Sequence, residues 1–259
     1  MTRTLPIIDS HCHLDFPVFD HNREQLIAQC SQAGMKAIIV PGVVQATWSN
    51  IQALCKDTPL LYPAYGMHPC FMEQHSQHHL PLLDAQLEQG ALAVGEIGLD
   101  IFHHSENLEQ QLALFRAQLV IAQNHDLPVI IHCRKAHDVM LKTLREVSFK
   151  AGGIMHAFSG SLQQAERFIE LGFKLGFGGA ATYERAQKLR KILMAVPDSA
   201  IVLETDSPDI PPAFARHQPN SPYNLFRITD ILAQVKGCEP ATLARLSTQN
   251  VSQILDLPS

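Results

Sequence analysis

Short apolar runs recur roughly every thirty residues along this chain, and Gly, Pro, Ser or a charged residue follows closely behind each. Such runs predict buried strands, and the segments between them are long enough for helices. One segment shows helical spacing clearly, with apolar residues at Leu108, Leu112, Phe115 and Leu119. We predict eight strands, at residues 6–11, 37–41, 61–66, 92–97, 128–132, 153–156, 173–177 and 200–205.

A strand followed by a helix, eight times over, indicates a parallel β/α architecture. The chain has 259 residues, and a (β/α)₈ TIM barrel needs about 250. An open doubly wound sheet would place a glycine-rich phosphate loop after the first strand, whereas this strand ends in DSHCHLD. We therefore predict one TIM-barrel domain over residues 1–259, with a loop at 208–222, a helix at 223–235 and an extra C-terminal helix at 240–255.

The net charge of −5 argues against a broad surface for duplex nucleic acid, because such surfaces carry an excess of Lys and Arg. It still permits a nucleic-acid substrate that is held at one end by metal ions. The N-terminus lacks the apolar stretch of a signal peptide, and no apolar run approaches the length of a membrane span. The six cysteines show no C-x-x-C pair. We expect a cytoplasmic protein, monomeric, with no membrane association and no obligate protein partner.

Imidazole and carboxylate side chains stand at or just beyond the ends of five predicted strands. The C-terminal ends of the strands form the catalytic face of a TIM barrel, so these side chains are candidates for one metal centre. Four imidazoles with two carboxylates suit zinc or a similar divalent ion, whereas Mn²⁺ and Mg²⁺ prefer more oxygen ligands. The candidate ligands are His11, His13, Glu96, His132, His156 and Asp206.

Several of these ligands also have a plainer interpretation, and His132 or His156 taken alone would more often be a core histidine whose hydrogen bonds are satisfied. His11 and His13 share one face of a strand, with Asp9 one step deeper, where its carboxylate would orient an imidazole. An isolated H-x-H is nevertheless more often two polar residues at a strand end. Glu96 follows an apolar run expected to face the barrel interior, and no Lys or Arg within ten positions is available to pair with it. Glu204 shares a face with Asp206 and fits a supporting position better than a ligand.

The motifs resemble those of the TatD-like metal-dependent hydrolases, within the wider amidohydrolase-type barrels. They run in the family's order from residue 8 to about residue 250, and a Glu stands at the fourth strand where many amidohydrolase relatives use a carboxylated Lys. Residues 159–176 are similar to the YjjV-like branch, although Ile101 and Ala157 depart from common family residues and leave the substrate open. The matching pieces are IDSHCHLD, YGMHP, VGEIGLD, VIIHCRKAHD, MHAFSG, LETDSPDIP and NSP.

The resemblance implies two divalent metal ions, zinc as bound or Mg²⁺ or Mn²⁺ in the cell. It places one ion on His11, His13 and Asp206 and the second on His132 and His156. Glu96 would bridge the two ions. Two such ions activate a shared water, and Asp206 is a candidate to accept the proton of that water.

We expect a deoxyribonuclease that resembles a 3′–5′ exonuclease and acts on DNA ends. His68 matches the G-x-H-P motif of the family, which implies that it contacts the phosphate or the leaving group. The alternative interpretation is that His68 makes only a capping or loop hydrogen bond. Arg134 lies two positions beyond His132, where it can meet a phosphate bidentately or simply begin a solvated helix. An ordinary charged helix face is expected for Arg185, Lys188, Arg190 and Lys191.

Two other classes of function compete with this expectation. The same pair of metal ions would serve a small-molecule amidohydrolase, phosphoesterase or lactonase, since barrels of this kind host many reactions. A non-catalytic binding protein is the third class, and it would usually have lost one or more ligands. This chain retains the complete set of six.

Overall fold

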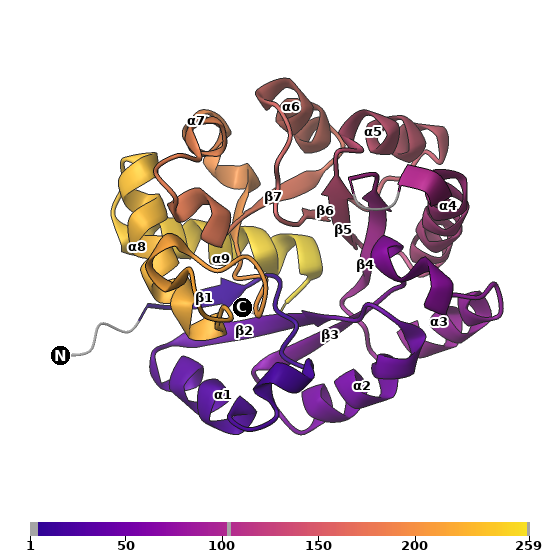
Figure 1. Ribbon diagram of the computed structural model, residues 1–259, viewed down its shortest axis with the longest axis horizontal. Helices are drawn as coiled ribbons and strands as arrows, with labels where there is room; N and C mark the ends of the chain where they lie inside the picture. The colour runs from indigo at the N-terminus through magenta and orange to yellow at the C-terminus, as the bar shows by residue number, and fades with distance from the viewer. Residues whose placement is uncertain (1–4, 103–104, 258–259) are drawn as a thin grey trace.

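A single parallel sheet lies at the centre of the computed structural model, which describes residues 5–102 and 105–257. Its eight strands pair in chain order, each with the next, and the helices lie around the outside (Figure 1). The predicted TIM barrel is therefore confirmed. The strands are β1 Ile7–Asp9, β2 Met35–Pro41, β3 Leu61–Tyr65, β4 Ala93–Asp100, β5 Val129–Arg134, β6 Gly153–Met155, β7 Phe173–Phe177 and β8 Ile201–Leu203.

The first and last strands meet through a few backbone contacts that close the ring. The Ser10 N–H donates to the Leu203 carbonyl at 3.1 Å, and Cys12 forms an isolated parallel bridge with Ser207. The bridge between Cys12 and Ser207 lies beyond the last residues of β1 and β8. The contact between the two ends of the chain therefore extends past the strands, to the C-terminal end of the barrel. Residues from both ends of the chain consequently become neighbours there.

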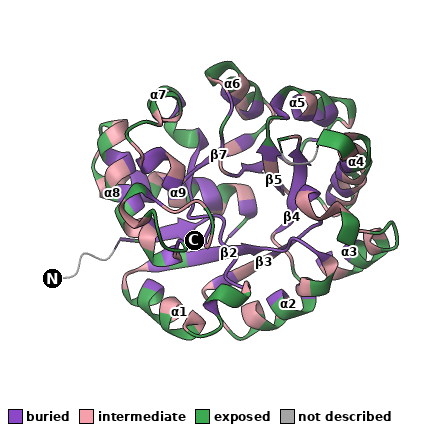
Figure 2. Cartoon of the chain, viewed as in Figure 1, coloured by how far each residue is buried: buried purple, intermediate pink, exposed green. Residues whose placement is uncertain are grey.

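All the α-helices except the last begin beyond the C-terminal ends of the strands and run back along the outside of the barrel (Figure 1). Figure 2 shows exposed residues on their outward faces and buried residues on the strands. The α-helices are α1 Arg23–Gln32, α2 Trp48–Lys56, α3 His79–Leu87, α4 Leu108–Asn124, α5 His137–Glu146, α6 Leu162–Glu170, α7 Gln187–Ala195, α8 Leu225–Lys236 and α9 Pro240–Leu255. Short 3₁₀ turns are η1 Pro17–Phe19, η2 Gln45–Thr47, η3 Pro69–Gln74, η4 Ser105–Asn107, η5 Gly179–Thr182, η6 Asp198–Ala200, η7 Ala213–Ala215 and η8 Pro222–Asn224.

Helix α9 covers the N-terminal end of the barrel. Its residues Val251 and Leu255 pack with Ile8, Ile130 and other apolar side chains of the barrel interior. Its Asn250 amide donates to the carbonyl of Ile201 at 2.7 Å, at the start of β8. The extra C-terminal helix predicted from the sequence is therefore present, and it leaves the opposite end of the barrel for the candidate site.

The expected connection between β8 and α8 is also observed. Residues 208–222 form a loop with one 3₁₀ turn inside it and another beginning at its end. The Asn220 amide donates to the carbonyl of Thr205 at 2.7 Å, which ties the far end of the loop to the end of β8. Within residues 5–102 and 105–257, none of the helices is both long enough and apolar enough to cross a lipid bilayer.

Candidate metal centre

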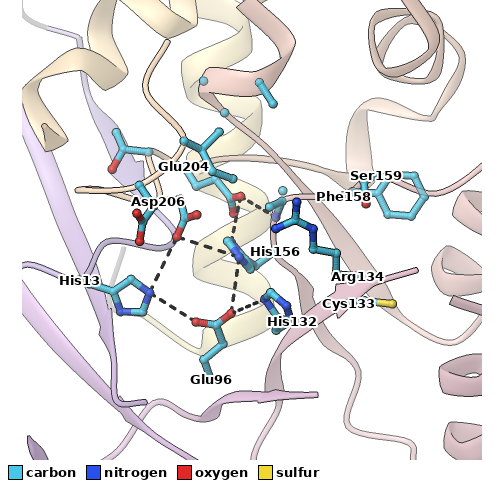
Figure 3. Close-up of a pocket in the computed structure, with 18 of the residues that line it drawn as sticks. His13, Glu96, His132, Cys133, Arg134, His156, Phe158, Ser159, Glu204 and Asp206 are labelled. Carbon is cyan, nitrogen blue, oxygen red and sulfur yellow. Dashed lines mark hydrogen bonds and ion pairs between the residues drawn. The ribbon is translucent and has the colours of Figure 1, made fainter. Parts of the chain in front are cut away.

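The six predicted ligands meet at the C-terminal end of the barrel, although they come from five different strand ends. A cavity of about 640 Å³ opens there, and Glu96, His132 and Asp206 line it. Figure 3 shows these side chains pointing toward one another. The close approach of Glu96 to both His13 and His132 is the spatial relation on which the expected metal centre depends.

The Glu96 carboxylate lies between two groups of histidines. Its Oε2 atom is 3.1 Å from Nε2 of His11 and 3.4 Å from Nε2 of His13. Its Oε1 atom is 3.2 Å from Nδ1 of His132 and 3.5 Å from Nε2 of His156. One oxygen therefore faces each group, which is the arrangement required of a carboxylate that bridges two cations.

Glu96 reaches the barrel interior because β4 is irregular. The pairing of β4 with β5 shifts register between Val94 and Ile97, as at a β-bulge. Val94 and Ile97 both pack in the core between sheet and helices, so the run before Glu96 is not uniformly interior as the sequence suggested. The extra residue turns the Glu96 side chain inward, where it is only 1% exposed.

Asp206 completes the first group. Its Oδ1 atom lies 3.6 Å from Nε2 of His11, 3.8 Å from Nε2 of His13 and 4.0 Å from Nε2 of His156. The Asp206 N–H donates to the His11 carbonyl at 2.9 Å. The junction of the first and last strands therefore sets the position of this carboxylate. The ligand atoms of His11, His13 and Asp206 lie within 4.8 Å of one another.

The chemistry of these side chains fits divalent cations. Imidazole nitrogens and carboxylate oxygens are the ligands of zinc and similar ions. Glu96 Oε1 is buried and makes no hydrogen bond of good geometry among the described residues, although ring nitrogens of His68 and His132 each lie 3.2 Å from it. A buried carboxylate is costly unless it is paired, and a cation would pair with this oxygen.

The electrostatics of the site also favour added positive charge. Burial lowers the pKa of His13, but Glu96 and Asp206 outweigh burial and raise it to about 9. Burial likewise lowers the pKa of His156, and Asp206 with Glu204 and Glu96 raises it to about 10. Burial raises the pKa of Asp206 to about 7, against the opposing effects of His156 and His13. The carboxylates thus hold protons on His13 and His156, in positions where a cation would replace them, whereas burial and the charge of His156 lower the pKa of His11.

Glu204 lies directly behind His156. Its Oε1 atom is 3.2 Å from Nδ1 of His156 and accepts the Ala157 N–H at 2.6 Å. A Cβ atom added to Gly176 would stand 2.2 Å from Glu204 Oε2, so only glycine leaves room for this carboxylate. The contact turns Nε2 of His156 toward Glu96, consistent with the supporting position expected from the sequence.

Asp100 stands in the same relation to His132, and sequence reasoning missed it. Its Oδ2 atom is 3.1 Å from Nε2 of His132 and accepts the Cys70 S–H at 3.5 Å. The Asp100 carbonyl accepts a hydrogen bond from the Gln111 amide at 3.0 Å. The available signal was its place in the same motif as Glu96, four residues further along one strand.

Asp9 has a different position from the one expected. We predicted that its carboxylate would orient an imidazole, but it accepts hydrogen bonds from backbone and hydroxyl groups instead. Oδ1 accepts the Thr205 N–H at 2.9 Å and the His11 N–H at 3.3 Å, and Oδ2 accepts the Thr205 hydroxyl at 2.6 Å. Asp9 therefore joins the end of β1 to the end of β8 beneath His11 and Asp206.

His68 makes the loop hydrogen bond that was its alternative interpretation, and its other ring nitrogen faces Glu96. Its Nδ1 atom accepts the Cys70 N–H at 3.1 Å, which caps η3. Because Nδ1 is an acceptor, Nε2 carries the proton, and Nε2 lies 3.2 Å from Glu96 Oε1. Burial lowers the pKa of His68 to about 4, which keeps this imidazole neutral.

A family model described as TatD related DNase matches residues 8–256. The chain belongs to this family. The uncharacterized metal-dependent hydrolase YjjV of Escherichia coli K12 is 40% identical over 255 residues, which cover 97% of this chain and 98% of that protein. The 3′–5′ ssDNA/RNA exonuclease TatD of Erwinia billingiae is 29% identical, over 98% of this chain and 100% of that protein.

Solved structures of the TatD family share the whole fold. The crystal structure of YjjV from Escherichia coli superposes with a TM-score of 0.93 at 39% identity, covering 97% of this chain and 98% of that chain. A TatD family hydrolase from Entamoeba histolytica, 18% identical, superposes with a TM-score of 0.85. The second similarity extends to the fold alone.

The mouth of the barrel carries an arginine and several aromatic rings. Arg134 is exposed and lines the cavity, and its guanidinium lies 4.4 Å from the centre of the Phe102 ring. Phe16 also lines the cavity and stacks on His13 with 4.7 Å between ring centres. The arginine is therefore free to meet an anion at the entrance, beside apolar surfaces suited to a ring or a chain.

Proposed function

We propose that the chain is a metal-dependent hydrolase that cleaves phosphodiester bonds of DNA, one nucleotide at a time from a 3′ end. The observation that carries this proposal is the Glu96 carboxylate, whose Oε2 atom faces His11 and His13 and whose Oε1 atom faces His132 and His156. Membership of the TatD-related DNase family and the similarity to a relative named as a 3′–5′ exonuclease support the choice of substrate.

Two divalent cations would occupy the centre. His11, His13 and Asp206 would hold one cation, His132 and His156 the other, and Glu96 would contact both. The mixed nitrogen and oxygen donors suit zinc, and Mg²⁺ or Mn²⁺ would be alternatives in the cell. The supporting carboxylates Glu204 and Asp100 would keep the two imidazoles of the second group in orientation.

A pair of bound cations supplies an acidified water and positive charge for a phosphate oxygen. Asp206 would accept the proton of the attacking water, because its carboxylate lies at the cavity wall among the ligands. Arg134 would bind a non-bridging phosphate oxygen, and His68 would donate from Nε2 toward the phosphate or the leaving group. The enclosed cavity and the acidic chain favour a strand end over a long duplex.

Substitution of the ligands tests the proposal directly. His156→Ala and Asp206→Asn should each lower the hydrolysis of a labelled oligonucleotide by at least about 100-fold, because each removes a ligand and Asp206→Asn also removes the base. The far-UV circular dichroism spectrum should stay that of the folded protein. Retention of most of the activity in either variant would refute the assignment.

One observation favours a second candidate, a hydrolase of small esters, lactones or amides. The cavity of about 640 Å³ lies within the range of small-molecule sites, and Phe16, Phe71 and Phe158 line it. Parallel assays with labelled oligonucleotides, a p-nitrophenyl phosphodiester and amide and lactone panels, each with Zn²⁺, Mn²⁺ or Mg²⁺, separate the two. A higher kcat/KM on an amide or lactone than on every phosphodiester would favour this second candidate.

A further inference from the structure

We propose that the side of the mouth between the end of β5 and the start of α7 binds the phosphates of a single nucleic-acid strand beyond the scissile bond. We call this surface the cationic rim, and it consists of Arg134, Arg185 and Lys188. The inference deepens the proposed nuclease function and rests on it. It narrows the earlier expectation that the cations around α7 form an ordinary charged face.

The cavity at the metal centre continues toward Arg185. Ala180 and Ile210 line this cavity and also line a neighbouring depression of about 560 Å³. Tyr183, Arg185, Ala186 and Pro211 form the rest of that depression. A chain that leaves the metal centre past Ala180 therefore meets the Arg185 guanidinium next.

Lys188 lies along the same side. Its neighbour Leu189 lines the main cavity. Lys188 is also close enough to the start of α5 that its charge contributes, after burial, to lowering the pKa of His137. His137 begins α5 three residues after Arg134. Arg134 and Lys188 thus lie on the same side of the mouth, at the end of β5 and in α7, with β6 and α6 between these two units of the barrel.

The rim cations are available to an anion. In the described part of the chain, no ion pair joins Arg134, Arg185 or Lys188 to a carboxylate, whereas paired cations elsewhere include Arg23, Arg116, Arg167 and Lys236. All three rim side chains belong to exposed residues. Such a concentration of unpaired positive charge at the mouth contrasts with the chain's net charge of −5.

Aromatic rings hold two of these guanidinium groups in place. Arg134 lies 4.4 Å from the centre of the Phe102 ring, and Arg185 lies 5.1 Å from that of Tyr183. Stacking on a ring orients the guanidinium and leaves its N–H groups free for phosphate oxygens. Two carboxylates stand nearby, Asp209 on the cavity wall and the exposed Glu184, and they confine the positive strip to a narrow path.

A narrow strip of cations with adjacent rings fits a single strand better than a duplex. Proteins that bind single strands without sequence preference combine cations along the backbone with aromatic surfaces for the bases. A duplex needs a wide positive face. The rim therefore predicts binding that is independent of sequence and that strengthens as the strand becomes long enough to reach Arg185 and Lys188.

Charge reversal at the rim tests the proposal. The double variant R185E/K188E is compared with R145E/K150E, which makes the same change in charge at exposed residues near the far end of α5. Both are made in full-length protein that also carries Asp206→Asn, so that the probe is not consumed. Fluorescence anisotropy with a labelled single-stranded oligonucleotide of about twelve nucleotides gives Kd, and thermal melting verifies folding.

The rim variant should raise Kd about tenfold and make the slope of log K against log salt less steep by roughly 1.4, about 0.7 for each phosphate that the rim no longer neutralises. The control variant should shift Kd by less than about threefold, as expected for distant exposed charges. Trinucleotide binding should change less than binding of the longer strand.

Each result decides one of the two proposals. Equal Kd values for the rim and control variants would overturn the rim proposal, as would an equal loss on a blunt duplex of the same length. A protein with intact Asp206 that hydrolyses neither the oligonucleotide nor bis(p-nitrophenyl) phosphate would refute the proposed nuclease function. The binding comparison, which requires no turnover, would still decide the role of the rim.

Discussion

At the scale of single residues, carboxylates behind the histidines distinguish this centre from a chance cluster of polar groups. Asp100 and Glu204 each contact the imidazole nitrogen that points away from Glu96. Such contacts fix the orientation of a ligating histidine and increase its basicity. His132 is thereby set to present Nδ1, and His156 to present Nε2, toward the same carboxylate oxygen.

Asp100→Asn should lower the affinity for divalent metal about 10- to 100-fold, because an amide in this place holds His132 less firmly and no longer increases its basicity. Competition with a chelating dye measures the affinity. Asp84→Asn is the matched control, because Asp84 also contacts a histidine, His125, at 2.8 Å but on an exposed surface. Equal affinities in the two variants would show that Asp100 does not support the metal site.

The sequence predicted the side chains that meet at the site but not all of their partners. Each candidate ligand was conspicuous because it is a polar side chain at the end of an apolar strand. Asp100 escaped notice because a carboxylate near a turn is common, and only the fold places it against His132. We expected the Asp9 carboxylate to face an imidazole because we continued the alternation of side-chain directions through His13. Strand β1 ends at Asp9, so the alternation does not extend to the histidines.

His137 makes stability depend on pH. It packs against Phe158 and Phe168, and burial, followed by the charge of Lys188, lowers its pKa to about 4. As pH falls, His137 is therefore protonated in the unfolded chain before it is protonated in the folded one. Its contribution to the free energy of unfolding is fully present above about pH 6.5 and is lost progressively toward pH 4. The free energy of unfolding should fall by about 2 kcal/mol between pH 8 and pH 5.

Urea unfolding of the wild-type protein and His137→Gln across this range measures the effect. The variant should lose about 2 kcal/mol less stability over the same interval, whatever its absolute stability at pH 8. His217→Gln, at an exposed position in the loop after β8, serves as the control and should keep the wild-type dependence. Parallel pH profiles for His137→Gln and the wild type would contradict the prediction.

At the scale of elements, strands and helices were predictable where apolar periodicity is regular. The runs that became β2, β5 and β7 are the clearest cases, since each is mostly buried on both faces. Irregularities inside a strand were not predictable, because a bulge changes which residues face inward without changing the apolar pattern. The shift between Val94 and Ile97 is the example that matters most for the site.

Helix α9 should stabilise the barrel without taking part in catalysis. Leu255 is 2% exposed and packs with the interior side chains at the end opposite the metal centre. Leu255→Ala should cost about 3 kcal/mol of unfolding free energy, while kcat below the melting transition stays unchanged. Chemical denaturation measures the cost, with Leu162→Ala at an exposed position of α6 as the control. A fall in kcat without a fall in stability would contradict this division.

At the scale of the whole molecule, bound cations should stabilise the native state. The ligands come together only in the folded barrel, so cations bind the native chain in preference to the unfolded one. Removing them with a chelator should lower the melting temperature by roughly 5–10 °C, as expected for about 2.7 kcal/mol from an ion at 100 times its Kd. Addition of zinc should restore the melting temperature. In the Asp206→Asn variant, the chelator should lower the melting temperature by less than in the wild type.

Asp9 has a consequence for how the enzyme comes into being. It bonds to Thr205, which is separated from it by 196 positions in the chain. A nascent polypeptide that has emerged only as far as β7 contains most of the histidines of the site. It lacks Thr205, the residue to which Asp9 bonds beneath them. Catalytic competence would thus arrive late in synthesis, in a single step, when the ring closes.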